Sequence, residues 1–331
     1  MVSYATVSGD GVLSERFCGE KGGTGMWVKD WEPGDFCGTL YVHWPGLYPG
    51  SKNDHFKNMD FPDDIHKPVV LITGAAGGLG KALVRQFMSH DWMVIATDNR
   101  ELSLAEFLKE KFVRVMNMNV TSDLSVKTVF DNLVLQNIQL DLIINNAGID
   151  RYFPLSEAPA DDFINVFNVN VFGAYRVNQT FLPILRSPGG RIIHIGSESL
   201  HLKIPFMPYP LSKNLLESYS RALRQELGFL DIAVITVRPG AIRTSLLDGV
   251  SGLNQQKDSW KVDRPFQKFA SLAAKLVGHT ITADKAAEFI YKVSQQKRPR
   301  AVYRINNKIK LKLAALLPQS LLEKIIKRIL S

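Results

Sequence analysis

The sequence predicts an α/β fold, a doubly wound parallel sheet, and three observations lead to it. Nearly continuous apolar runs of five or six residues recur between residues 68 and 300, and segments long enough for helices separate them. Such runs are typical of parallel strands that are covered on both faces. A glycine-rich turn directly follows the first run. The composition, 45% apolar and 22% charged, is that of a globular protein.

The expected elements follow one another along the chain. The first strand covers Val69–Thr73, because four apolar residues lead into the glycines, and the first helix covers Leu79–His90. Further apolar runs predict the remaining strands at residues 92–97, 112–116, 140–144, 191–195 and 232–237. In such a sheet the ligand site lies beyond the carboxyl ends of the strands.

The chain divides into an N-terminal extension over residues 1–67, a catalytic domain over 68–300 and a tail over 301–331. The extension holds ten of the 24 glycines and three of the five tryptophans, Trp27, Trp31 and Trp44. We expect it to be an irregular segment packed on the main domain, and disorder is the competing interpretation. The sequence assigns it no function.

Cysteine use and hydropathy indicate the compartment. Both cysteines, Cys18 and Cys37, precede residue 40, which suits a reducing compartment and excludes a thiolate zinc site in the rest of the chain. Free thiols are favoured over a Cys18–Cys37 bridge. No secretory signal opens the sequence, and no apolar run reaches the roughly 18 residues of a membrane-spanning helix. A cytoplasmic protein is expected, and since the histidines form no ligand set, no metal is expected.

The net charge of +8 is concentrated in the tail. Residues 297–331 contain ten lysines and arginines against Glu323 alone, so the rest of the chain carries −1. Ser320–Glu323 has the pattern of a capping box, and one face of the helix after it is apolar while the other is basic. This pattern predicts a helix that lies on a membrane surface or docks into a protein groove. Packing on its own domain or on a dimer partner is the alternative. No nucleic-acid partner is expected, because no aromatic stacking surface accompanies the basic residues.

The segment Thr73-Gly-Ala-Ala-Gly-Gly-Leu-Gly80 joins the first strand to the first helix. Glycines let the backbone approach a pyrophosphate, and the helix N-terminus offers N–H groups and partial positive charge. A Rossmann-type nucleotide site is therefore predicted. Asp98 stands roughly 20 residues further on, where a carboxylate accepts the ribose hydroxyls and repels a 2′-phosphate. NAD is therefore favoured over NADP, although Arg100 weakens the preference and an ordinary solvated loop aspartate is the alternative.

Three further motifs follow in order: Asn145-Asn-Ala-Gly148, Tyr209-Pro-Leu-Ser-Lys213 and Arg238-Pro-Gly-Ala-Ile-Arg-Thr244. Together with the glycine turn they resemble the short-chain dehydrogenase/reductase family across residues 68–300. Gly74-x-x-Gly77-x-x-Gly80 also fits the extended, epimerase-type branch of that family. The Asn-Asn-Ala-Gly element and the lack of a separate substrate region favour the short, non-extended branch.

The resemblance implies that Tyr209 is the acid/base and that Lys213 also binds the nicotinamide ribose. A tyrosine pKa near 10 is too high for this task, and a lysine one helical turn away favours the phenolate. Ser197 is implied to orient the substrate oxygen. The usual spacing lands on Gly196, so this choice requires a one-residue deletion, and Ser199 is the alternative. Asn170 is implied to support a water beside the lysine, with Asn168 as the competing choice.

The resemblance also implies the residues that hold the cofactor. Asn119 departs from the usual aspartate before Val120, and an amide retains an acceptor and a donor for the adenine. His194 replaces a common asparagine and is expected to be a packed, hydrogen-bonded residue rather than a catalyst. The implied cofactor-binding residues are Gly74, Ala76, Gly78, Leu79, Gly80, Asp98, Asn119, Val120, Asn146, Ala147, Gly148, Tyr209, Lys213, Pro239, Gly240, Ile242 and Thr244.

The expected function is that of an NAD-dependent oxidoreductase that interconverts a secondary alcohol and a ketone. Residues 198–208 and 245–274 are rich in apolar side chains such as Phe206, Leu246 and Trp260, which favours a steroid, retinoid or acyl-chain substrate. The tail is similar to that of hydroxysteroid and retinol dehydrogenases. The alternative is a catalytically silent NAD(H)-binding regulatory or scaffold protein, against which the intact catalytic residues argue. A homodimer or homotetramer is implied by the resemblance.

Overall fold

The computed structural model describes residues 4–7, 13–16, 67–201, 204–244, 260–276, 280–306 and 318–331. The chain forms two compact units, Met1–Asp63 and Asp64–Ser331. In the first unit β1 (Tyr4–Val7) pairs in antiparallel fashion with β2 (Leu13–Arg16). Apart from Lys67, the rest of the predicted extension, including its tryptophans and both cysteines, lies outside the described residues. The predicted domain limits stay predictions.

A seven-stranded parallel sheet forms the centre of the described part of the second unit, in the order β11-β8-β7-β6-β3-β4-β5. The predicted doubly wound α/β fold is thereby confirmed. Strand order reverses between β3 and β6, which is where such sheets bind their ligands. The strands are β3 (Val69–Thr73), β4 (Met93–Asp98), β5 (Val113–Asn117), β6 (Leu142–Asn145), β7 (Arg191–Ile195), β8 (Ala233–Pro239) and β11 (Val302–Ile305).

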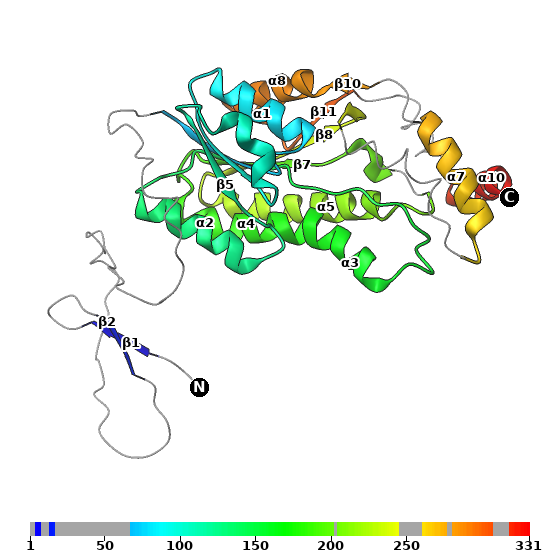
Figure 1. The fold of residues 1–331 in the computed structure, drawn as a ribbon, viewed down its shortest axis with the longest axis horizontal. Coiled ribbons are helices and arrows are strands. Elements are labelled where there is room, and N and C mark those ends of the chain that lie inside the picture. The colour runs from blue at the N-terminus through cyan, green and yellow to red at the C-terminus, as the bar shows by residue number, and fades with distance from the viewer. Residues whose placement is uncertain are drawn as a thin grey trace, which may run out of the picture. The chain divides into compact units, whose positions relative to one another are not determined.

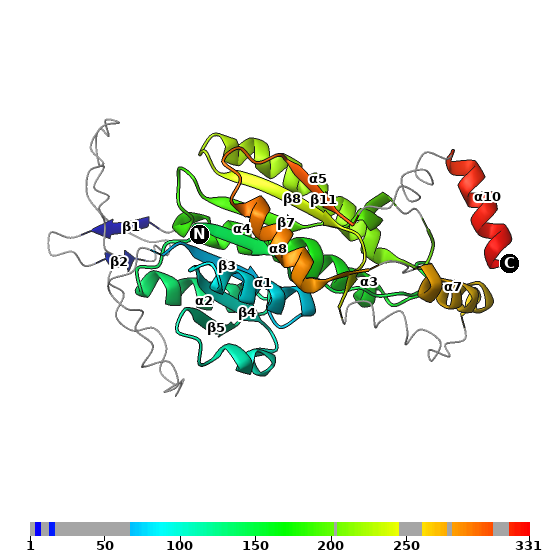
Figure 2. The ribbon, with the colours of Figure 1, turned by 90° about the horizontal axis from the view of Figure 1, so that it is seen from above.

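Helices cover both faces of the sheet (Figure 1). One face carries α1 (Gly78–Met88) and α8 (Ala283–Ser294), and Figure 2 shows both lying across the strands. The other face carries α2 (Asp123–Leu135), α4 (Gly173–Phe181) and α5 (Pro208–Gly228). The shorter helix α3 (Ala160–Phe167) continues through a π-helical turn, η3 (Asn168–Phe172), into α4.

The core forms because the apolar pattern of each element matches its period. β3 and β4 are buried along their whole length, as parallel strands covered on both faces must be. In α1, Leu79, Leu83 and Phe87 are buried at four-residue spacing, so they form one stripe against the sheet. The predicted first helix therefore exists, and it ends two residues earlier than expected.

The edge strand β11 was not predicted from the sequence. It pairs in parallel with β8, from Val302 opposite Thr236 to Ile305 opposite Pro239. The sheet thus extends beyond residue 300, where the tail was expected to begin. Its four residues are half-buried or exposed, so they do not form the apolar run that marks the other strands.

Beyond the sheet, α7 (Asp263–Leu276) and α10 (Gln319–Leu330) lie side by side (Figures 1 and 2). Leu330 of α10 joins a buried cluster with side chains from α7 and from two loops, and Ile326 packs against its edge. We call this set the aromatic cluster. Its buried members are Tyr152, Phe206, Phe266, Phe269, Ala270 and Leu330.

The predicted capping box of the tail helix is wrong. Pro318 is the N-cap of α10, and within the described chain no side chain caps it. Ser320 already lies inside the helix, since α10 begins at Gln319. Glu323 instead accepts a hydrogen bond from Gln319 Nε2 at 2.8 Å, one helical turn away. The rigid proline starts the helix one residue early, and the reciprocal contact of a capping box cannot form.

Among the helices in the described ranges, none combines the length and the apolar character needed to cross a bilayer. No three histidine, cysteine, aspartate or glutamate side chains in the same ranges group as metal ligands would.

Candidate active site

The glycine turn after β3 brings the backbone into close contact with the loop after β6. Gly74 has a positive φ of 65°, and a Cβ atom there would lie 2.7 Å from Ala147 Cα. A Cβ on Gly80 would lie 2.2 Å from the carbonyl oxygen of Gly74. Gly77 is the N-cap of α1, and no described side chain caps that end. The first N–H groups of α1 therefore face the carboxyl end of β3 without a side-chain acceptor.

The Asn-Asn-Ala-Gly segment supports the glycine turn. Asn146 Nδ2 donates to the carbonyl oxygens of Thr73 and Gly74, both at 3.0 Å. In return, Thr73 Oγ1 accepts from the backbone N–H groups of Asn146 and Ala147 at 3.1 and 3.0 Å. These bonds fix the two strand ends on either side of the reversal in strand order, where a ligand would bind.

Asp98 is a buried residue at the end of β4. Its Oδ2 accepts from the backbone N–H of Ala76 at 3.0 Å. Its Oδ1 accepts from the N–H and Nε of Arg100 at 3.0 and 3.2 Å. The interpretation of Asp98 as an ordinary solvated loop residue is therefore wrong, because its carboxylate anchors the glycine turn.

Two other predicted cofactor segments reach the same edge of the sheet. Thr244 follows β9 (Ile242–Arg243), and a Cβ on Gly78 would lie only 2.9 Å from Thr244 Cγ2. Thr244, the last residue of the predicted cofactor segment from Pro239, therefore lies against the start of α1. On the other side, Asn119 Oδ1 accepts from the N–H and Oγ1 of Thr121, so this amide oxygen closes the turn before α2.

Helix α5 carries Tyr209 and Lys213 in its first two turns. Lys213 Nζ lies 5.5 Å from the centre of the Tyr209 ring. The same nitrogen donates to the carbonyl oxygen of Ile195, at the end of β7, at 2.8 Å. Burial lowers the pKa of Lys213 to about 8, and the negative charge of Asp150 acts in the opposite direction. The predicted pair is therefore assembled at the carboxyl end of the sheet.

The pKa of Tyr209 lies above its ordinary value, whereas the spacing to Lys213 predicted that it would be lowered. Burial raises it most, and the charge of Asp150 raises it further, while a hydrogen bond with Ser197 lowers it. The lowering predicted from Lys213 is not among the effects on this phenol, which is buried beside a carboxylate. At neutral pH the proton thus resides on the phenol.

Ser197 and Asn170 lie at this site, and Ser199 lies directly beside Ser197. Ser197 acts on the Tyr209 hydroxyl by lowering its pKa, and Ser197 Oγ is 2.8 Å from Ser199 Oγ. Asn170 is buried in the π-helical turn η3, a feature that often marks functional positions. Its Nδ2 donates to Ser212 Oγ at 2.9 Å, on the helix of Tyr209. Asn168 Oδ1 instead accepts from Arg176 at 2.8 Å.

His194 is packed and hydrogen-bonded, as predicted. Its ring is fully buried, with Nε2 2.8 Å from Asn178 Nδ2 and Nδ1 2.6 Å from Ser220 Oγ. Burial lowers the pKa of His194 to about 3, so the ring is neutral at physiological pH. Its hydrogen bonds therefore connect β7 to α4 and α5.

Asp150 and Tyr152 belong to the site and were missed in the sequence. Tyr152 Oη donates to Asp150 Oδ2 at 2.8 Å. Burial raises the pKa of Asp150 to about 6, and the bond from Tyr152 lowers it. The available signal was the position of Asp150, a carboxylate two residues after Gly148 at the end of a central strand.

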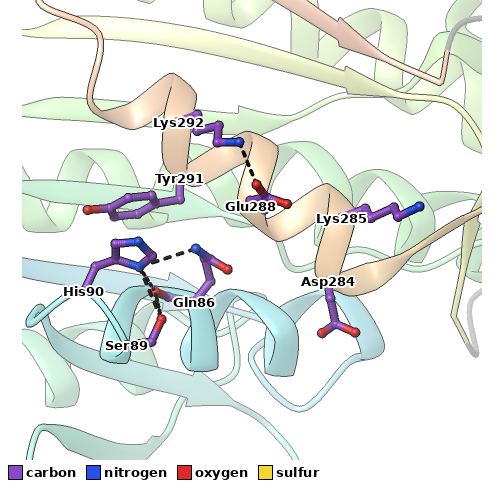
Figure 3. Close-up of a pocket in the computed structure, with 8 residues that line it drawn as sticks. All are labelled: Gln86, Ser89, His90, Asp284, Lys285, Glu288, Tyr291 and Lys292. Atoms are coloured by element: carbon purple, nitrogen blue, oxygen red, sulfur yellow. Dashed lines mark hydrogen bonds and ion pairs between the residues drawn. The ribbon is translucent and has the colours of Figure 1, made fainter.

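A hollow between α1 and α8 shares no residue with this site. Figure 3 shows the ring of His90 against Tyr291, and the pair Glu288–Lys292 joined by an ion pair of 2.6 Å. The side chains that line it are Gln86, Ser89, His90, Asp284, Lys285, Glu288, Tyr291 and Lys292.

Comparison with known sequences identifies relatives of this chain. A family model described as short chain dehydrogenase matches residues 68–252. The uncharacterized oxidoreductase YusZ of Bacillus subtilis is 29% identical over 80% of this chain and 99% of its own length. Estradiol 17-beta-dehydrogenase 2 of Rattus norvegicus is 30% identical over 59% of this chain and 52% of its own length.

Solved structures share the fold. A short-chain dehydrogenase/reductase from Burkholderia phymatum in complex with NAD has a TM-score of 0.62 and 22% identity, over 73% of this chain and 89% of that one. Actinorhodin polyketide ketoreductase with NADPH has a TM-score of 0.60 and 22% identity, over 72% and 95%. At this identity the likeness concerns the fold, and the two structures hold different nicotinamide cofactors.

Proposed function

Since the chain belongs to the short-chain dehydrogenase/reductase family, we propose that it is an NAD-dependent oxidoreductase that interconverts a secondary alcohol and a ketone on a lipophilic substrate. The observation that carries the proposal is the grouping of Ser197, Tyr209 and Lys213 at the carboxyl end of β7. A protonated phenol beside a serine hydroxyl is suited to donate its proton to a carbonyl oxygen.

The residues of the chain fit a dinucleotide. The N-terminus of α1 and the glycine turn would hold the diphosphate, because N–H groups without a side-chain acceptor and partial positive charge favour an anion. Asp98 would accept from the adenosine ribose, and Lys213 would bind the nicotinamide ribose. When bound, the nicotinamide supplies or accepts the hydride.

In this proposal Tyr209 holds the transferred proton on its hydroxyl. Ser197 orients the substrate oxygen toward that hydroxyl. Asn170 holds the adjoining backbone, since its Oδ1 accepts from the Ile149 N–H at 2.8 Å and its Nδ2 donates to the Ile149 carbonyl at 2.9 Å. Lys213, whose pKa of about 8 leaves it mostly charged at neutral pH, stabilises the phenolate that forms when the proton leaves.

The first experiment follows NADH oxidation by the purified protein with ketosteroids, retinoid carbonyls and 3-oxoacyl esters. NADH-dependent turnover of any of these ketones supports the proposal. Tight NADH binding with no turnover across the panel contradicts it and favours the alternative, a catalytically silent NAD(H)-binding regulatory or scaffold protein.

The proposed NAD preference depends on Asp98. NADH is expected to bind at least about tenfold more tightly than NADPH, because the carboxylate repels a 2′-phosphate. Asp98→Ala should reduce that ratio, as measured by fluorescence titration with both cofactors. Arg100→Ala is the control variant, because the side chain of Arg100 is 62% exposed. Tighter NADPH binding that is lost in Arg100→Ala would contradict the NAD preference and assign Arg100 to the phosphate.

The tail helix supports a lipophilic substrate and contact with a membrane surface. Leu330 is buried in the aromatic cluster, whereas Leu321, Ile325 and Ile329 are exposed. The exposed apolar side chains share α10 with Lys324, Lys327 and Arg328, a combination that binds anionic lipid surfaces. In the proposal the protein is cytoplasmic and peripheral on a membrane.

Vesicle flotation tests that contact. The protein should bind vesicles that contain phosphatidylserine, and Ile325→Asp together with Ile329→Asp should weaken binding by about tenfold or more, because two apolar anchors are lost. Leu124→Asp, at an exposed leucine of α2, is the matched control. Equal binding of all three proteins would refute membrane contact through α10.

Exposed apolar side chains on the helices that cover one face of the sheet support the proposed homodimer or homotetramer. Phe172 and Tyr175 lie at and after the π-helical turn, and Leu211 and Leu215 lie on α5, each more than 40% exposed. Apolar side chains gathered in this way are typical of surfaces that another subunit covers.

A further inference from the structure

Asp150 is held rigidly beside the proposed catalytic residues. It follows Ile149, whose N–H and carbonyl group are both bound by the amide of Asn170, at 2.8 and 2.9 Å. A Cβ on the neighbouring Gly148 would lie 3.6 Å from Lys213 Nζ. The backbone that presents Asp150 thus passes next to the lysine.

The two oxygens of the Asp150 carboxylate have different surroundings. Oδ2 accepts from the hydroxyl of Tyr152 at 2.8 Å. Oδ1 is buried, and within the described residues no donor reaches it with hydrogen-bond geometry, although the backbone N–H of Arg151 is close enough to the carboxylate to lower its pKa. A buried acceptor without a partner destabilises a fold, so such an atom in a structure requires an explanation. A ligand group with an O–H or N–H would supply the missing donor.

Asp150 shares its environment with the reacting groups. Its charge raises the pKa of Tyr209 and opposes the lowering of the Lys213 pKa. The pKa of Tyr152 is raised by burial and by Asp150, and to a smaller extent by Tyr209. The far side of Tyr152 is closed, because its ring packs in the aromatic cluster 6.2 Å from that of Phe269. Oδ1 is therefore the acceptor that this group of residues leaves for a bound molecule.

We propose that Asp150 is a specificity-determining residue whose Oδ1 accepts a hydrogen bond from a hydroxyl or amino group of the substrate, near the reacting carbonyl. The inference rests on the proposed function and narrows the substrate class to lipophilic ketones that carry such a donor. Two contacts then fix the substrate: Ser197 and Tyr209 donate to the carbonyl oxygen, and Asp150 accepts from the second group. An anionic substituent at that position would be repelled.

Matched substrates isolate the donor. The probes are a medium-chain methyl ketone with a hydroxyl group on the α or the β carbon, the corresponding methyl ethers, and the α-amino ketone. A hydroxy ketone and its ether differ in the O–H group that donates, so the ratio of their kcat/KM values reports on Asp150. The wild type should prefer the hydroxy ketone by about 10–100-fold, the range for a hydrogen bond to a charged group. The amino ketone shows whether nitrogen serves as well as oxygen.

Asp150→Asn tests the residue. Asparagine can still accept from Tyr152, and its NH2 group then replaces Oδ1, so a donor meets the donor of the substrate. The preference for the hydroxy ketone should fall by about 10–100-fold, while NADH binding stays unchanged. Asp161→Asn, at an exposed aspartate of α3, should behave as the wild type. An unchanged preference in an active Asp150→Asn enzyme overturns the inference and leaves the proposed function intact. A wild type that reduces no ketone overturns both.

A measurement on the wild type keeps the inference falsifiable if Asp150→Asn does not fold. The groups that face Asp150 are Tyr152, Arg151, Lys213 and Tyr209. Their titration affects both members of a probe pair and cancels in the ratio. Since burial raises the pKa of Asp150 to about 6, the preference for the hydroxy ketone should decline as the pH falls through 6. A ratio that stays constant from pH 8 to pH 5 counts against Asp150.

Discussion

Tyr209→Phe is expected to lower kcat/KM for ketone reduction by about 10²–10⁴-fold, the range over which a positioned acid contributes to proton transfer. The substitution removes the hydroxyl and keeps the ring, so the packing at the start of α5 is preserved. NADH binding should change little, because Lys213 and the glycine turn remain. Steady-state kinetics on the best ketone of the panel and a fluorescence titration with NADH measure the two quantities.

Tyr219→Phe is the matched control for this prediction. Tyr219 lies on the same helix, and its hydroxyl accepts a hydrogen bond from Asn178 Nδ2 at 3.2 Å. Asn178 in turn contacts His194 of β7. Loss of that hydroxyl should leave turnover near the wild-type value. If Tyr209→Phe kept most of its activity while Tyr219→Phe lost it, the proton would come from another group and the proposed role of Tyr209 would be wrong.

Most of the sheet could be predicted from the sequence, because its central strands are buried on both faces and read as apolar runs. β3 and β4 are buried throughout, and both were expected within a residue or two of their observed limits. β11 was not predicted, because an edge strand pairs with only one neighbouring strand and its other edge is open. Its Val302, Tyr303 and Ile305 are half-buried and Arg304 is exposed, so burial imposes no apolar run on it.

Residues of the site that stand in spaced motifs were found in the sequence, whereas those defined by contacts across the fold were not. The spacing of Tyr209 and Lys213 places them one helical turn apart, and the structure has them so. The pKa of Tyr209 depends first on burial and then on Asp150, which comes from the loop after another strand. The spacing of residues along the sequence shows neither the burial of Tyr209 nor the nearness of Asp150. The direction of the Tyr209 pKa shift could therefore not be predicted from it.

The buried ion pair between Arg238 and Glu217 is expected to have the largest effect on stability. Arg238 Nε donates to Glu217 Oε2 at 2.6 Å, and Arg238 Nη2 donates to Glu217 Oε1. Both residues are more than 90% buried, where β8 packs on α5. Arg238→Ala would leave the carboxylate buried without its counter-charge, which should lower the free energy of unfolding by about 3–5 kcal/mol. Urea denaturation of wild type and variant measures the difference.

Two further variants separate the ion pair from simple loss of packing. Arg238→Met combined with Glu217→Leu removes both charges and fills the space, so the double variant should recover most of the lost stability, as buried pairs replaced by apolar side chains commonly do. Lys127→Ala breaks the exposed pair with Asp131 on α2 and should cost about 0–1 kcal/mol. Because Arg238 directly precedes Pro239 and Gly240, Arg238→Ala should also weaken NADH binding, whereas Lys127→Ala should not. A loss of less than about 1 kcal/mol in Arg238→Ala would show that the carboxylate remains solvated, and the pair would then contribute no more than a surface one.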